Sequence, residues 1–229
     1  MIEALRLGIV SRGTTLWDGL DFAFEDGAAA VIVGPPSCGK TLLLSTLRGE
    51  RKPDAGEVLV SGRSLYRAEE SVATAFRTIC GYAPERFDAD SRLTVNSLFV
   101  RSSMVCGDIA LPERKHRWER LLAMVGMTGK EEAHLAQLSC SERVRVVLAA
   151  ELLRSPKVLF TDGAVMAAGT PYMEMMGNLF RVLAGAGNIV VAMERRLPQG
   201  WEKFARQCKP VGPFLEYRLP PIVMNGETA

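Results

Sequence analysis

The feature that most constrains the fold of this chain is a segment near its N-terminus, Gly34-Pro35-Pro36-Ser37-Cys38-Gly39-Lys40-Thr41. It matches the pattern G-x-x-x-x-G-K-[ST]. Residues 28–33 before it form an apolar run of strand length, and residues 41–48 after it favour a helix. A buried strand, a glycine-rich turn and a helix in this order predict a phosphate-binding loop in an α/β fold.

Phosphate chemistry explains the residue types of this loop. Glycines let the backbone curl so that successive N–H groups converge on phosphate oxygens, and the N-terminus of the following helix adds its dipole. We expect Lys40 to reach the β- and γ-phosphates of a nucleotide and the Thr41 hydroxyl to ligate Mg²⁺. All eight residues of the loop are therefore candidate nucleotide-binding residues. Cys38 in the cradle is either a redox-sensitive thiol or, as we favour, a small side chain at a variable position.

Composition narrows the function classes. The chain has 229 residues, which suits one domain with a real core. Its 28 basic and 26 acidic residues leave a formal charge of only +2, so a nucleic-acid partner is not expected. The two histidines, His116 and His134, lie far apart, which argues against chemistry that needs a histidine cluster.

Cysteine usage and hydropathy bear on the compartment. The five cysteines are odd in number and form no C-x-x-C pair, which argues against a disulfide framework or a zinc site and fits a reducing cytosol. We find no apolar stretch of about 18 residues and no secretory signal. The expected location is the cytoplasm, with the possibility of peripheral attachment to a membrane protein.

The remaining pattern alternates strands and helices. Two alternating runs, residues 2–10 and 16–24, predict an antiparallel pair, and residues 57–60, 79–82, 158–161 and 188–193 predict further strands. Helices are expected over residues 69–77, 114–127, 142–153 and 171–184. The stretch from about residue 86 to 155 is rich in charges and helical periodicity. We therefore expect one α/β domain over residues 1–229, with a mostly parallel core, an N-terminal antiparallel β subdomain and an inserted helical subdomain at about 86–155.

Landmarks after the loop occur in a recognisable order. Residues 49–58 include Pro53-Asp54-Ala55-Gly56-Glu57, Leu138-Ser139-Cys140-Ser141-Glu142 stands farther along, and the strand at 158–161 runs into Asp162. In order and spacing these segments resemble the nucleotide-binding subunits of ATP-binding cassette (ABC) transporters. The resemblance runs from about residue 5 to 193 and implies a P-loop NTPase fold, with ATP and Mg²⁺ as ligands.

The departures from the family pattern concern the residues that the family uses for hydrolysis. The glutamine of the family's Q-loop is here Glu85, and the acidic residue after the Walker B aspartate, the family's general base, is here Gly163. Glu194 stands where the family has its switch histidine. By resemblance, Thr41, Asp162 and Glu85 are the candidate Mg²⁺ ligands, and no catalytic position is intact.

Hydrolysis of ATP needs a proton acceptor for the attacking water and stabilisation of charge around the γ-phosphate. Gly163 has no side chain to polarise water, and Glu194 is expected to place a repelling anion near the γ-phosphate. We therefore predict that ATP binds and that hydrolysis by this chain is weak or absent.

The family signature is also altered. Ser139 and Glu142 match it, but Cys140 and Ser141 replace two glycines, and we expect their side chains to hinder the approach of a second subunit's nucleotide. The family's sites form between two subunits, so the resemblance implies a homodimer or a heterodimer with another ABC ATPase subunit. A weaker hypothesis gives Arg12 the place of the aromatic residue that stacks on adenine.

The sequence thus favours an ATP-binding subunit that couples nucleotide binding to a membrane permease, with permease contact expected at residues 88–107. A non-hydrolysing regulatory or assembly subunit is the alternative. A small-molecule kinase is a remoter one, since residues 138–156 resemble no substrate lid. The transported substrate and the role of the Pro-rich tail after residue 201 stay open.

Overall fold

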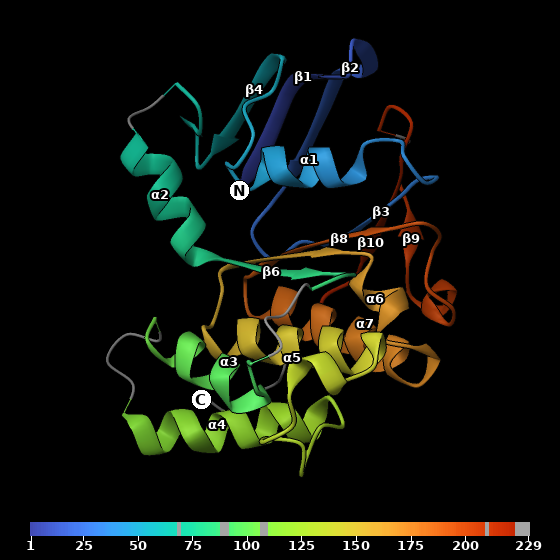
Figure 1. Ribbon diagram of the computed structural model, residues 1–229. Helices are drawn as coiled ribbons and strands as arrows, with labels where there is room; N and C mark the ends of the chain where they lie inside the picture. The colour runs from blue at the N-terminus through green and yellow to red at the C-terminus, as the bar shows by residue number, and fades with distance from the viewer. Residues whose placement is uncertain (68–69, 88–91, 106–109, 209–210, 223–229) are drawn as a thin grey trace.

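The computed structural model describes residues 1–67, 70–87, 92–105, 110–208 and 211–222. Two sheets and two groups of helices are stacked in layers (Figure 1). Helix α1 (Lys40–Leu47) lies between the sheets, while α5 (Cys140–Leu153) and α7 (Thr170–Gly185) cover the other face of the larger sheet. The expected α/β class is confirmed.

The larger sheet has the order β6-β7-β8-β3-β10-β9. Its parallel part consists of β6 (Cys80–Pro84), β7 (Val158–Asp162), β8 (Ile189–Glu194) and β3 (Ala29–Val33). The tail adds β10 (Leu215–Leu219) and the short β9 (Arg206–Gln207), both antiparallel to their neighbours. The mostly parallel core is therefore as expected, and the tail, left open by the sequence, completes one edge of it.

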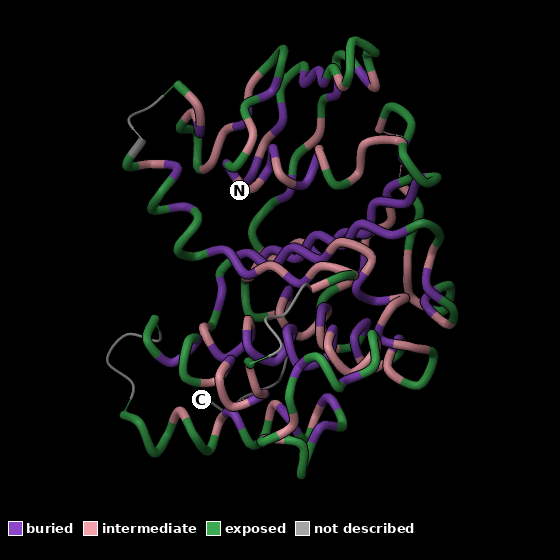
Figure 2. Tube along the Cα trace, in the orientation of Figure 1, coloured by how far each residue is buried: buried purple, intermediate pink, exposed green. Residues whose placement is uncertain are grey.

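The parallel strands are buried on both faces, which is why they read as continuous apolar runs. Alternate residues enter two cores. On β3, Ala30 and Ile32 join the cluster with α1 and the smaller sheet, whereas Ala29 and Val31 join the cluster with the helices below. Figure 2 shows this burial as a continuous purple band along the strands. The band gives a rigid platform for the loops at the strand ends.

The smaller sheet has the order β2-β1-β4-β5 and is antiparallel. Strands β1 (Ile2–Ser11) and β2 (Thr14–Phe24) form the expected hairpin, and β4 (Ala55–Val60) and β5 (Arg63–Ser64) follow the turn after α1. At the hairpin tip Arg12 and Gly13 have φ of 51° and 76°, the left-handed conformation of a tight turn.

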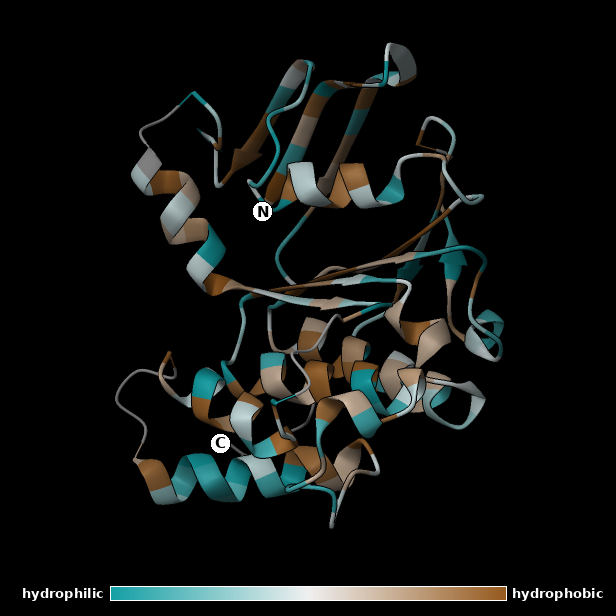
Figure 3. Cartoon of the chain, in the orientation of Figure 1, coloured by the Kyte–Doolittle hydropathy of each residue, from teal (hydrophilic) through white to brown (hydrophobic). Residues whose placement is uncertain are grey.

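Three helices cluster below the larger sheet, namely α3 (Val95–Ser103), α4 (Leu111–Met124) and α5. Trp118 and Leu122 of α4 are its buried residues, and the outer surface of α4 is hydrophilic (Figure 3). Helix α2 (Glu70–Ile79) lies apart, before β6, and short helical turns complete the chain at η1 (Leu135–Gln137), α6 (Ala164–Ala167) and η2 (Trp201–Lys203).

Most element boundaries fall within three residues of the expected ones. Two helices were not assigned from the sequence. Helix α3 begins at a capping box in which Thr94 accepts from the Ser97 N–H and Ser97 from the Thr94 N–H. Helix α6 has only four residues, too short to show a helical period. In the described part of the chain, no helix combines the length and apolar composition needed to cross a bilayer.

Candidate phosphate-binding site

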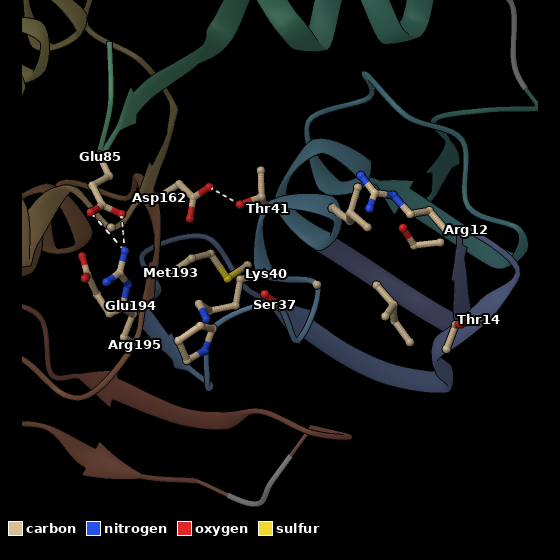
Figure 4. A pocket seen from close by; sticks show the side chains of 16 residues that line it. Arg12, Thr14, Ser37, Lys40, Thr41, Glu85, Asp162, Met193, Glu194 and Arg195 are labelled. Atoms are coloured by element: carbon tan, nitrogen blue, oxygen red, sulfur yellow. Dashed lines mark hydrogen bonds and ion pairs between the residues drawn. The ribbon is translucent and has the colours of Figure 1, made fainter.

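A cavity of about 650 Å³ opens where the carboxyl ends of β3, β7 and β8 meet. Ligands of open α/β sheets bind at this edge, beyond the strand ends. The predicted loop forms one wall of the cavity, Asp162, Gly163 and Glu194 form another, and the hairpin tip closes the far end (Figure 4). Strand topology therefore brings together four separate segments of the sequence: the hairpin tip, the loop, residues 162–163 and residue 194.

The loop conformation depends on its glycines. Gly39 has a φ of 93°, and a Cβ atom there would lie 2.7 Å from Nε1 of Trp17. A Cβ atom on Gly34 would lie 2.8 Å from the Cys38 sulfur. Only glycine satisfies both requirements, the left-handed backbone and the close packing. The loop is anchored to the sheet because the Gly34 N–H donates to the carbonyl oxygen of Glu194 at 3.2 Å.

Lys40 folds back over this loop. Its ammonium donates to the carbonyl oxygens of Gly34 and Pro35 at 2.6 and 2.7 Å and lies 3.7 Å from the Cys38 sulfur. The ammonium therefore lies at the loop itself, where phosphate oxygens would replace or join the carbonyl partners.

Thr41 and Asp162, two of the three expected Mg²⁺ ligands, are in contact. The Thr41 hydroxyl donates to Oδ2 of Asp162 at 2.6 Å across 121 residues of sequence. A hydroxyl and a carboxylate are oxygen donors of the kind that Mg²⁺ prefers, usually together with phosphate oxygens and waters. The two side chains thus fit a magnesium ion bound through the phosphates.

Glu85, the third expected ligand, is engaged elsewhere. Its carboxylate lies 3.2 and 3.1 Å from Nη2 of Arg195, although its N–H donates to the Asp162 carbonyl oxygen at 2.5 Å. The backbone therefore holds Glu85 beside the Thr41–Asp162 pair while its charge is paired with Arg195 (Figure 4).

Gly163 stands between these groups in a conformation that suits glycine. Its φ is 69°, and a Cβ atom there would lie 2.9 Å from both Cβ and Oε2 of Glu85. The space that a side chain at position 163 would occupy is thus already filled by Glu85.

Glu194 corrects an expectation from the sequence. Its side chain is buried, Oε1 accepts from the Val165 N–H at 2.9 Å, and Oε2 has no hydrogen-bond partner among the described atoms. Burial raises the pKa of Glu194 to about 8, outweighing the hydrogen bonds from the Val165 and Met166 N–H groups, and the charges of Asp162 and Glu85 raise it further. At neutral pH the side chain is therefore mainly a neutral acid, and it does not supply the repelling anion that its position in the sequence suggested.

This raised pKa makes stability depend on pH. From the ordinary value of 4.5 up to about 8, the folded chain keeps a proton that the unfolded chain releases, so the free energy of unfolding falls as pH rises through this window. We expect Glu194→Gln to reduce that fall by an amount on the order of a few kcal/mol. Urea unfolding of both proteins at pH 5 and pH 8 measures the difference, and an identical pH dependence would contradict the assignment.

The family model for the ABC transporter matches residues 17–166, which include the loop, Glu85, the altered signature and Asp162. The chain belongs to the ABC transporter family.

Individual proteins agree with this assignment. The methionine import ATP-binding protein of Geobacillus kaustophilus is 31% identical over 153 residues, which are 67% of this chain and 44% of that protein. The L-cystine transport system ATP-binding protein of Escherichia coli is 28% identical over 189 residues, 80% of this chain and 75% of that protein. The chain thus spans less than half the length of the methionine relative.

Solved ABC cassettes share the fold. A bacterial ABC transporter cassette solved as a dimer superposes with a TM-score of 0.74 at 20% identity, covering 86% of this chain and 88% of that one. The same cassette, bound to ADP and inorganic phosphate, gives the same TM-score. Both the family and the fold that the resemblance implied are confirmed.

The segment that resembles the ABC signature, residues 138–142, caps helix α5. The Ser139 hydroxyl accepts from the Glu142 N–H, and Lys130 and Ser139 lower the pKa of Glu142 to about 2 by hydrogen bonding to its carboxylate. The Ser141 hydroxyl donates to the Ala168 carbonyl oxygen at 2.5 Å. The Cys140 sulfur lies 3.6 Å from the carbonyl oxygen of Glu85. The Ser141 hydroxyl is thus engaged within its own chain, and its effect on a second subunit stays a prediction.

Sequence reasoning missed Arg195 among the residues that line this cavity. Arg195 lines the cavity and pairs with Glu85, whereas the sequence alone assigned it no part in the site. The available signal was its place directly after the strand that carries the switch position. Arg12 also lines the cavity, at the end away from Glu85 (Figure 4), which is compatible with a contact to the base of a nucleotide.

Proposed function

We propose that this chain is an ATP-binding subunit that binds Mg-ATP in the cavity and couples binding to a membrane permease, with hydrolysis weak or lost. The observation that carries the proposal is the joint placement of a complete phosphate loop and the Thr41–Asp162 pair, next to a Gly163 that bears no base. The whole chain, with a helical subdomain at about residues 86–155, forms the ATP-binding domain.

The nucleotide fits the cavity in one direction. The loop and Lys40 take the phosphates, the Thr41 and Asp162 oxygens hold Mg²⁺ against them, and the hairpin end with Arg12 is left for the base. Magnesium supplies positive charge to the phosphates when bound. The residues Gly34 to Thr41 are the proposed binding set, and Glu85 is an accessory ligand only if it leaves Arg195.

Magnesium dependence tests this arrangement. We expect Thr41→Val to reduce the gain in ATP affinity that Mg²⁺ provides by about tenfold, because a valine has similar shape but no oxygen for the metal. Titrating ATP with and without Mg²⁺ into the wild type and the variant measures this gain. The exposed Thr15→Val serves as the control, and an unchanged Mg²⁺ effect in Thr41→Val would remove Thr41 from the metal site.

Hydrolysis is weak or lost because the residues around the carboxyl end of β7 provide no general base. A general base must lie within hydrogen-bonding reach of the attacking water. Gly163 offers none, Glu194 is mainly protonated at neutral pH, and Glu85 is paired with Arg195. None of the three positions that depart from the family pattern thus presents a free carboxylate.

Permease contact is proposed at residues 88–107, of which 88–91 and 106–107 lie outside the described residues. Within the described part Val100, Met104 and Val105 are exposed, at 51%, 77% and 59% of their surface, and Leu111 beyond it at 62%. Figure 3 shows apolar brown at the end of α3 and the start of α4. An exposed apolar patch of this kind suits a docking surface for another protein.

The partner set follows from the family. We propose a homodimer or a heterodimer with another ABC ATPase subunit, no nucleic acid, and a cytoplasmic location on the face of the permease. The relatives are named for the import of methionine and the transport of cystine. An import role is therefore part of the proposal.

Phosphate release decides between this function and its alternative. The chain is assayed with Mg-ATP alone and with its co-expressed permease, with Lys40→Ala as the blank. Turnover that appears only with the permease and is lost in Lys40→Ala supports a driving subunit. Tight ATP binding without release in either case supports the alternative, a non-hydrolysing regulatory or assembly subunit, which the occupied space at Gly163 favours.

A further inference from the structure

An ion pair spans the end of the central strand of the site. Glu85 follows β6 and Arg195 follows β8, and these strands flank β7, which ends at Asp162. The pair joins residues 110 positions apart at 3.1 Å. It therefore passes the end of β7 next to Asp162 (Figure 4), where Glu85 lies against Gly163, the first residue beyond β7.

Gly163 makes room for this pair. A Cβ atom at position 163 would lie 2.9 Å from the Glu85 carboxylate, so any larger residue would displace Glu85 from Arg195. The replacements at positions 85 and 163 thus form one structural unit with Arg195. The Glu85–Arg195 ion pair, a bridge across β7, occupies the space where the family has an acidic side chain at position 163.

Arg195 lies next to the phosphate loop as well. The preceding residue, Glu194, accepts the Gly34 N–H on its carbonyl oxygen at 3.2 Å, and β8 lies between β7 and β3 in the sheet. Residue 195 therefore leaves the sheet between the loop on one side and the end of β7 on the other, and its guanidinium reaches across the end of β7 to Glu85. Its side chain is 57% exposed and lines the same cavity as Lys40 and Thr41.

The charges suit a phosphate between these groups. Arg12, Lys40 and Arg195 are the basic residues that line the described cavity. Arg12 lies at the hairpin end and Lys40 at the loop, so Arg195 is the cation on the side opposite the hairpin (Figure 4). A planar guanidinium binds phosphate oxygens in pairs, and a dianionic phosphate competes well with a single half-exposed carboxylate.

We propose that Arg195 binds the terminal phosphate of ATP, that Glu85 positions its guanidinium across Gly163, and that Arg195 held in this way lets the chain distinguish ATP from ADP. The inference rests on the proposed function, because it requires a nucleotide in the cavity. It gives the replacements at positions 85 and 163 a role in retaining ATP.

Calorimetric titration of Mg-ATP and Mg-ADP into the purified chain tests the proposal. We expect Arg195→Ala to weaken ATP binding by about 10- to 100-fold and ADP binding by less than about twofold, since ADP lacks the phosphate that Arg195 contacts. The matched control is Arg196→Ala, an exposed neighbour that does not line the cavity. Circular dichroism of each variant verifies that it is folded.

The variant Glu85→Gln separates two effects of Glu85: its hydrogen bond, which positions the Arg195 guanidinium, and its negative charge. The amide oxygen can still accept from the guanidinium, but the competing negative charge is gone, so ATP affinity rises a few-fold and ADP affinity stays the same. The rise disappears in the double variant with Arg195→Ala, because Glu85 acts through Arg195.

The outcomes are distinct. Equal losses for ATP and ADP in Arg195→Ala, or an effect of Glu85→Gln that persists without Arg195, contradict this inference alone. A wild-type chain that binds neither nucleotide contradicts the proposed function and the inference together.

Discussion

Replacing Lys40 by alanine is expected to weaken Mg-ATP binding by about 100-fold or more, because a charged hydrogen-bond donor to phosphate contributes on the order of 2–3 kcal/mol. The ammonium already lies at the loop, bonded to the carbonyl oxygens of Gly34 and Pro35. Its loss removes both the positive charge and the contacts that organise these carbonyls. Few other single changes in the cavity remove so much attraction for an anion.

Calorimetry with Mg-ATP measures the loss, and Lys52→Ala is its control, because Lys52 is an exposed lysine in the turn after α1. Thermal unfolding separates binding from stability, since Lys40 is only half-buried and its replacement should leave the fold intact. If Lys40→Ala retained wild-type affinity, nucleotide would have to bind elsewhere than the loop.

Local signals predicted the phosphate loop and the central strands correctly. The loop needs glycine, lysine and threonine at fixed spacing, so its residues lie together in the chain as well as in space. Strands such as β3 and β8 are buried on both faces and stand out as apolar runs. Thr41 and Asp162 were brought together only by the family resemblance, and in the structure their side chains are in contact.

The bridge between Glu85 and Arg195 could not be predicted in this way. Each residue, taken alone, resembles a solvated charge, and only the order β6-β7-β8 brings them over Gly163. The neutral state of Glu194 was equally hidden, because its pKa depends on burial that the sequence does not display. Charge at this site is set by the packing around it more than by residue type.

The tail shows the same limit at the level of the fold. Residues 214–217 resemble a strand, but nothing local tells which edge they join. In the structure Leu219 pairs with Ala29 and Leu215 with Val33, so β10 protects the edge of β3 that lies just before the phosphate loop. Long-range pairing of this kind depends on what the rest of the sheet leaves open.

Restoring the family's acidic residue with Gly163→Glu is expected to leave phosphate release at its original level and to lower the free energy of unfolding by about 1–3 kcal/mol. The φ of 69° is unfavourable for any residue with a Cβ atom, and that atom would lie 2.9 Å from Glu85. The new carboxylate would also stand beside that of Glu85, and like charges at this distance repel.

Matched glycines separate these causes. Gly129 also has a positive φ, 80°, with nothing near a Cβ atom, so Gly129→Ala measures the backbone cost and Gly163→Ala adds the contact with Glu85. Urea unfolding should show Gly163→Ala to be the less stable variant. In a double variant Glu85→Ala should relieve only the part of the difference that comes from the carboxylate, because alanine keeps the Cβ atom that would lie 2.9 Å away. Equal stability of Gly129→Ala and Gly163→Ala would mean that Glu85 moves away from the new Cβ atom at no cost in free energy. A Gly163→Glu protein that hydrolyses ATP rapidly would show that the missing base alone limits turnover. The ion pair between Glu85 and Arg195 would then not prevent an acidic residue at position 163 from acting as the base.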